Sequence, residues 1–280
     1  MRTISCLFLV LAISTLTGAQ RLTSLDSRVS DILGRMKGQD LATREAAFGE
    51  MMALISEEDR PAGSSGQSHA MTVFLAQHPN QADSIKLGLI ELLGSENDLF
   101  VLGKNAAPDT YTEEDGEYHA GLITAVSSLD DERAIPALVG AMTTGGIAQR
   151  GILKYGDKAL EPVLEQLKNP DGLVRATALG LSFSLLKRQN DPASLKRVTD
   201  LVRSSLTDPD TVVRRRAVRE IDCLADRQEY VPTLEKIAKT DPEKRLGKAL
   251  DGGDGEEFYP VRYDARRVLR DIQNNKSCTP

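Results

Sequence analysis

Apolar residues recur at helical spacing in the second half of the chain. In the segments NPDGLVRATAL, DPDTVVRRRAV and FYPVRYDARRV, a Val-Arg pair is followed three residues after the Arg by Ala. A Leu or Ile also stands ten residues after each Arg. These positions lie on one side of an α-helix, so each segment is predicted to be a helix with one buried face. The three triplets are Val174-Arg175-Ala178, Val213-Arg214-Ala217 and Val261-Arg262-Ala265.

Helices of a second kind are predicted between these three. The segments AIPALVGAM, ALEPVLEQL and YVPTLEKIA each contain a Pro followed two residues later by Leu, and Pro is tolerated in the first turn of a helix. The step from Arg175 to Arg214 is 39 residues, and the step from there to Arg262 is 48. Helix pairs that repeat at a period near 40 residues, each unable to bury its apolar face alone, indicate an all-α protein built as an α-solenoid.

The second half resembles the HEAT-repeat family, in particular its bacterial HEAT-like branch. The resembling stretches are DDERAIPALVGAM, KYGDKALEPVLEQLKNPDGLVRATAL and LTDPDTVVRRRAVREI, with a Pro in the first helix and Val-Arg in the second. The resemblance implies a right-handed solenoid of HEAT-like helical pairs over residues 129–273, with an insertion near 244–258 and a tail at 274–280. It implies little about function.

The first half is predicted to hold diverged repeats of the same array, over residues 20–128. KGQDLATREAAFGEMMAL places Arg44, Ala47, Met51 and Leu54 at the same relative positions as the later repeats. HPNQADSIKLGLIELL does so more loosely. Mobile loops are expected near 56–68 and 95–115, because Pro, Gly, Ser and acidic residues there offer little to bury.

The first 19 residues have the layout of a secretory signal peptide. One early Arg precedes an apolar run, and small residues lead to a cleavage site near Ala19. The alternative is a buried N-terminal helix. Cleavage would make the protein secreted or periplasmic, without stable membrane insertion. In an oxidising compartment Cys223 and Cys278 could form a disulfide, and the alternative is two free thiols.

Composition and charge narrow the classes of partner. Aromatic residues make up 4% of the chain and Trp is absent, which favours helices over a β-sandwich. The net charge of −6 gives no reason to expect nucleic acid as a partner. Residues 20–150 hold 10 Lys and Arg against 20 Asp and Glu, whereas residues 151–280 hold 24 against 21. This asymmetry suggests different partners or self-association, and random drift of a solvated surface is the alternative.

The sequence contains no motif that announces catalysis or a cofactor. It has no G-x-S-x-G, P-loop, G-x-G-x-x-G or H-E-x-x-H pattern. His69, His78 and His119 are scattered, and the acidic loops do not place carboxylates where a calcium-binding EF-hand needs them. No catalytic residue, cofactor or metal is therefore predicted.

Arginine is the residue type to which we assign roles. The resemblance implies a structural ladder in which one Arg of each repeat pairs with an Asp at a turn, each pair contributing about 1 kcal/mol or less when partly exposed. The ladder residues would be Arg175, Arg214 and Arg262 with Asp171, Asp208 and Asp210. A helical wheel turns Arg215 and Arg219 away from the apolar face, so they are expected to point to solvent. Arg267 and Arg270 would join them in a basic strip on the concave surface, for an acidic protein or polymer. The alternative is an ordinary charged face with interleaved acids.

The function expected from these features is an exported, non-catalytic HEAT-like scaffold that binds a protein or polymer partner through its concave surface. The alternative is a HEAT-like lyase or enzyme accessory protein, which would require the N-terminal segment to remain uncleaved. A third interpretation is a module that stacks head to tail through its acidic and basic halves.

Overall fold

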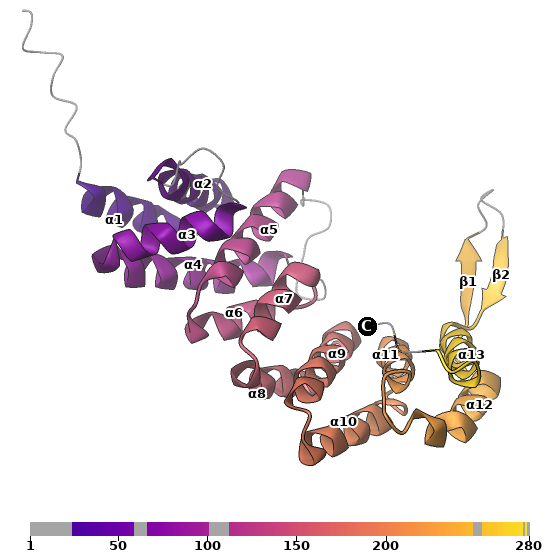
Figure 1. Cartoon of the computed structure of the whole chain (residues 1–280). Helices are drawn as coiled ribbons and strands as arrows, with labels where there is room; N and C mark the ends of the chain where they lie inside the picture. The colour runs from indigo at the N-terminus through magenta and orange to yellow at the C-terminus, as the bar shows by residue number, and fades with distance from the viewer. Residues whose placement is uncertain (1–23, 59–65, 101–111, 249–253, 277, 279–280) are drawn as a thin grey trace, which may run out of the picture.

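The computed structural model describes residues 24–58, 66–100, 112–248, 254–276 and 278, and these form mainly α-helices (Figure 1). The predicted all-α class is confirmed, with one two-stranded hairpin added. The signal-peptide prediction for 1–19 falls outside the described residues. The helices are α1 (Leu25–Met36), α2 (Leu41–Glu58), α3 (Gly66–Gln77), α4 (Pro79–Phe100), α5 (Glu113–Ser128), α6 (Ile135–Gly140), α7 (Gly146–Lys154), α8 (Asp157–Glu165), α9 (Gly172–Gln189), α10 (Pro192–Ser205), α11 (Thr211–Ile221), α12 (Val231–Thr240) and α13 (Pro260–Gln273).

Helix starts follow from Asp and Pro in the sequence. Asp171, Asp191 and Asp210 precede α9, α10 and α11, and each carboxylate accepts a backbone N–H from the first turn. Such caps satisfy donors that have no partner within the helix. Pro stands in the first two positions of α6, α10, α12 and α13, where its missing N–H costs nothing. Of the three Pro-x-Leu segments, only the one containing Pro162 places its Pro beyond the first turn of a helix, in the interior of α8.

The second half of the molecule is arranged as two rows of helices (Figure 1). Helices α5, α7, α9, α11 and α13 form one row, in which each helix packs against the next. Helices α8, α10 and α12 lie along the other side of this row, and each also packs against a helix of it. In Figure 1 the row from α7 to α13 follows the inner side of a bend, and α8, α10 and α12 follow the outer side.

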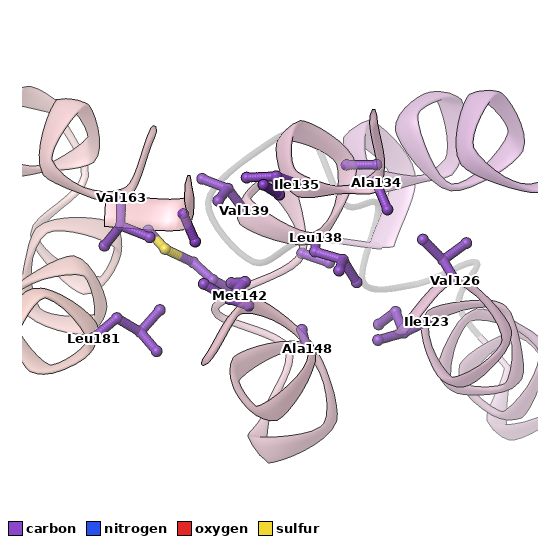
Figure 2. Packing of buried hydrophobic residues seen from close by; sticks show 14 of the residues in the cluster. Ile123, Val126, Ala134, Ile135, Leu138, Val139, Met142, Ala148, Val163 and Leu181 are labelled. Carbon is purple, nitrogen blue, oxygen red and sulfur yellow. The ribbon is translucent and has the colours of Figure 1, made fainter. Parts of the chain in front are cut away.

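A continuous apolar core holds the two rows together. Figure 2 shows Ile123 and Val126 of α5, Leu138 of α6, and Val163 and Leu181 of α8 and α9 projecting into the same layer. Leu138 and Val163 are completely buried. Burying one such side chain stabilises the fold by roughly 1.5–3 kcal/mol. The apolar stripe predicted for the helix around Arg214 is confirmed by the burial of Val213, Ala217 and Ile221.

Helices occupy parts of the ranges 56–68 and 95–115, for which loops were predicted. Helix α2 extends to Glu58, α3 begins at Gly66, α4 extends to Phe100 and α5 begins at Glu113. The remaining parts, 59–65 and 101–111, lie outside the described residues. Helix α4 continues because its last polar residues are buried with partners: the carboxylate of Glu96 accepts from Arg44, and the amide of Asn97 donates to the carbonyl oxygen of Ala137 at 2.8 Å. Sequence polarity alone did not reveal this burial.

The insertion near 244–258 contains the exception to the all-α class. Strands β1 (Arg245–Lys248) and β2 (Asp254–Phe258) pair antiparallel, with Arg245 opposite Phe258. Figure 1 shows the hairpin projecting away from the helices beside α13. Residues 249–253, between the strands, lie outside the described residues.

Candidate functional site

Arg175 and Arg214 occupy equivalent positions in α9 and α11 and make equivalent contacts. Each donates through Nη1 to two carbonyl oxygens of the turn before its own helix, at 2.8–3.0 Å. Each also donates through Nε and Nη2 to one carboxylate of the following turn. Arg175 binds Asp208 at 3.0 and 2.8 Å, and Arg214 binds Asp241 at 2.9 and 3.3 Å. The side chains of all four residues are at most 16% exposed. These arginines therefore tie successive turns together.

The acceptors in this ladder differ from the prediction. Asp171 and Asp210 do not accept from the ladder arginines. Their carboxylates accept the backbone N–H groups of the residues two positions later, at 2.7 and 2.8 Å. The reason is their place at the helix starts, where the nearest donors without partners are backbone groups. Arg262 also departs from the pattern, since its Nε donates to the carbonyl oxygen of Asp241 at 2.6 Å and its guanidinium lies over the Tyr259 ring.

Asp241, the acceptor for Arg214 that was not predicted, can be recognised from a repeated triplet in the sequence. The triplet Thr-Asp-Pro occurs at 207–209 and again at 240–242. In both triplets one carboxylate oxygen of the Asp also accepts the backbone N–H two residues later, at 2.8 and 3.1 Å. The repeated triplet thus marks the same turn twice, and comparing the two would have identified Asp241.

Arg44 in the first half makes the same set of contacts. Its Nη1 donates to two backbone carbonyl oxygens of the preceding turn, and its Nε donates to Glu96 at 2.5 Å. Glu96 is fully buried and also accepts from the hydroxyl of Tyr118 at 3.2 Å. Burial, with the Glu96 charge adding to it, raises the pKa of Tyr118. Beside it, burial lowers the pKa of His119 to about 4, so this imidazole is neutral near pH 7.

Arg215 and Arg219 form ion pairs within the protein that the sequence does not predict. The Nε of Arg215 donates to the carboxylate of Asp264 on α13 at 2.9 Å, and Arg219 donates to the same carboxylate at 3.2 and 3.4 Å. The side chain of Asp264 is only 3% exposed, whereas those of Arg215 and Arg219 are 27% and 47% exposed. The expectation that both point freely to solvent is therefore corrected: α11 packs on α13, which places this acid between them.

Arg216 lies on the side of α11 that faces α9. A Cβ atom at Gly180 would stand 2.0 Å from its Nη2 atom, so only a glycine there leaves room for this guanidinium. The Nε of Arg216 pairs with Glu220, whose side chain is 10% exposed. Burial raises the pKa of Glu220, and the charge of Arg216 opposes that rise. The helical pattern around Arg214 does not predict a role for Arg216, although Gly180 inside a predicted helix is a signal of close approach.

A groove of about 230 Å³ lies between α7, α9 and α11. These three helices belong to the row that follows the inner side of the bend in Figure 1. Arg215, Arg216 and Arg219 line the groove, together with Leu173, Thr177 and Val212 among others. We call this site the arginine groove. It brings together two of the four arginines predicted for the basic strip and adds Arg216.

The other two arginines of the predicted strip lie on α13, outside the arginine groove. Arg267 is half-buried and pairs with Asp271 at 3.3 Å. Arg270 is exposed and has no ion-pair partner among the residues that the structure describes. The four arginines of the predicted strip therefore lie in two places, with Arg215 and Arg219 in the groove and Arg267 and Arg270 on α13.

A disulfide joins Cys223, just after α11, to Cys278 in the C-terminal tail, with Cα atoms 5.0 Å apart. The tail is held a second time by Arg227, whose Nη2 donates to the carbonyl oxygen of Lys276 at 2.7 Å. Disulfides of this kind are typical of proteins in oxidising compartments. The bond closes a sequence separation of 55 residues.

In the described ranges, no three His, Cys, Asp or Glu side chains gather in a group that could hold a metal ion. No helix in those ranges is long and apolar enough to cross a membrane.

Comparisons with known proteins give little resemblance. No protein-family model matches the chain, and no curated protein is similar to it at a significant level. A crystal structure of an engineered protein aligns with 89% of this chain and 98% of its own, at 16% identity and a TM-score of 0.36.

Proposed function

We propose that this protein is an exported, non-catalytic scaffold of the HEAT-like α-solenoid type, which binds an acidic protein or polymer through the inner face of its helical row. Support for the solenoid comes from the matching contacts of Arg175 and Arg214, one repeat apart, and of Arg44 in the first half. A repeating array gives an extended inner surface on which a partner can bind.

The arginine groove is the observation that carries the binding proposal. It is lined by residues of three helices of the inner row, three arginines among them, although the whole chain is acidic. A local concentration of positive charge on an otherwise acidic protein attracts an anionic surface. The partner is therefore expected to present negative charge to this face.

Export is supported by two features at opposite ends of the chain. The apolar N-terminal run is followed by small residues, as in a signal peptide. The disulfide between Cys223 and Cys278 is compatible with an oxidising compartment. N-terminal sequencing of the native protein should begin near Gln20, and retention of Met1 would overturn the proposed export.

Site-specific photo-crosslinking tests the binding surface. A photoreactive residue in place of Thr177, in the arginine groove, should give a covalent adduct in the native exported fraction. The matched control is the same residue in place of the exposed Glu235 on α12, on the outer side of the bend. The adduct at position 177 should weaken at high salt, because screening reduces attraction between exposed charges. Equal adducts at both positions, or none at position 177, would refute the proposal.

A further inference from the structure

The arginine groove contains guanidinium N–H groups that the protein leaves available. Arg215 and Arg216 each use Nε, for Asp264 and Glu220 respectively. Their Nη atoms have no hydrogen-bond partner among the described residues. Each guanidinium offers five N–H donors in a rigid plane. Both residues line the groove, so a group that enters it can reach N–H donors that the protein does not use.

The charges around the groove do not cancel. Arg215, Arg216 and Arg219 contribute three positive charges, and their ion-pair partners are the two carboxylates of Asp264 and Glu220. One positive charge remains when both acids are ionised. An entering group with a single negative charge would balance it, and each charge-assisted hydrogen bond would be stronger than a bond between neutral groups.

The size and walls of the groove limit what that group can be. At about 230 Å³ the groove is smaller than the 300–1,000 Å³ typical of sites for whole small-molecule ligands. It has room for about one amino-acid side chain. The apolar side chains of Leu173 and Val212 also line it, and Leu173 is 36% exposed. A short hydrocarbon segment ending in an anion would match both surfaces.

We propose that the arginine groove binds an acidic peptide segment, with the carboxylate of one Asp or Glu hydrogen-bonded to the Nη atoms of Arg215 and Arg216. The aliphatic part of the peptide packs against Leu173 and Val212. A planar carboxylate fits a guanidinium with two parallel bonds, and its single charge equals the unbalanced charge of the groove. This inference rests on the proposed function and names the chemistry of the partner.

Fluorescence anisotropy with labelled synthetic peptides tests the inference on the full-length mature protein. The probe is a peptide of alternating Glu and Ala, and its matched control carries Gln in place of every Glu. The Glu peptide should bind at least about tenfold more tightly than the Gln peptide, and the difference should shrink as salt is added. Equal binding of the two peptides overturns the inference. Displacement of the Glu peptide by inorganic phosphate or a phosphoserine peptide at lower concentration also overturns it, in favour of a phosphoryl site.

Variants connect the binding to the groove. The pair Arg216→Gln with Glu220→Gln removes the guanidinium without leaving a buried carboxylate unpaired, and should weaken the Glu peptide about tenfold or more. Thr177→Glu adds a competing carboxylate to the groove and should have the same effect, which decides the matter if the first variant does not fold. Arg197→Gln removes an exposed ion pair to Glu161 on the outer helices and should leave binding unchanged.

Unchanged binding of the Glu peptide by the groove variants, or an equal loss in Arg197→Gln, overturns the inference. The photo-crosslinking result separates this failure from failure of the proposed function. An adduct at position 177 combined with peptide binding that the variants do not affect would retain the inner face as the binding surface and reject the carboxylate assignment.

Discussion

Replacing Arg214 with Gln should destabilise the fold far more than a surface ion pair would. The guanidinium makes two hydrogen bonds to the Asp241 carboxylate, at 2.9 and 3.3 Å, and two to backbone carbonyl oxygens, at 3.0 and 2.9 Å. Both side chains are largely buried, at 12% and 6% exposure. Removing one partner of a fully buried pair costs about 3–5 kcal/mol, and an exposed pair contributes about 0–1 kcal/mol.

We expect a loss of about 2–4 kcal/mol for this substitution, because Asp241 keeps one bond from the backbone N–H of Glu243 at 3.1 Å. This exceeds the value of about 1 kcal/mol or less that sequence reasoning assigned to a partly exposed pair. The matched control is Arg197→Gln, because Arg197 and its partner Glu161 are 46% and 69% exposed. The control should lose about 1 kcal/mol or less.

The assay is urea unfolding followed by far-ultraviolet circular dichroism, with the midpoint and slope compared for each variant. A double-mutant cycle with Asp241→Asn should give a coupling energy of about 1 kcal/mol or more, because the two side chains are in direct contact. If Arg214→Gln and Arg197→Gln lose the same stability within about 0.5 kcal/mol, the burial of the ladder has no energetic consequence and the reasoning is refuted.

Three further predictions concern His119, the disulfide and Gly180. Burial lowers the pKa of His119 to about 4 from its ordinary 6.5, so the unfolded chain binds a proton before the folded protein does as pH falls. The folded protein therefore loses stability between pH 6.5 and pH 4. By pH about 5 the loss should reach about 2 kcal/mol, and urea unfolding of His119→Gln should lack that part of the pH dependence. Cys223→Ser should lower the free energy of unfolding by about 2–5 kcal/mol, and equal urea midpoints for the variant and the native protein under non-reducing conditions would contradict this. Gly94→Ala, with open space around it in α4, should stabilise by about 0.5–1 kcal/mol, whereas Gly180→Ala forces the Arg216 guanidinium to move and should gain less. Equal melting temperatures for the two variants would contradict the close approach at Gly180.

The sequence predicted the parts of the fold that depend on local periodicity. Val213 and Ala217 are buried as the helical pattern indicates, and Asp208 accepts from Arg175, which lies 33 residues before it. Both relations involve spacings that recur along the chain, so they are visible without coordinates. The disulfide between Cys223 and Cys278 was foreseen only as one of two alternatives, because nothing local fixes the geometry of cysteines so far apart.

The parts that sequence reasoning missed depend on which helices become neighbours. Asp264 lies 49 residues after Arg215, beyond the irregular insertion, and only the packing of α13 on α11 brings them together. Glu96 and Asn97 are polar and were therefore assigned to a loop, although their partners in α2 and α6 bury them in α4. Each of these contacts joins two distant segments and occurs only once in the described residues, so no repeated sequence pattern predicts it.

Helix α11 shows how one run of arginines acquires separate roles. Successive residues are rotated by about 100° around a helix, so adjacent side chains leave it in different directions. Arg214 reaches the turn that contains Asp241, Arg215 reaches Asp264 on α13, and Arg216 reaches across Gly180 on α9. The first contact is largely buried and Arg214 does not line the groove, whereas Arg215 and Arg216 both do. Stability and the proposed partner binding therefore depend on adjacent residues of α11, and substitutions can separate the two properties.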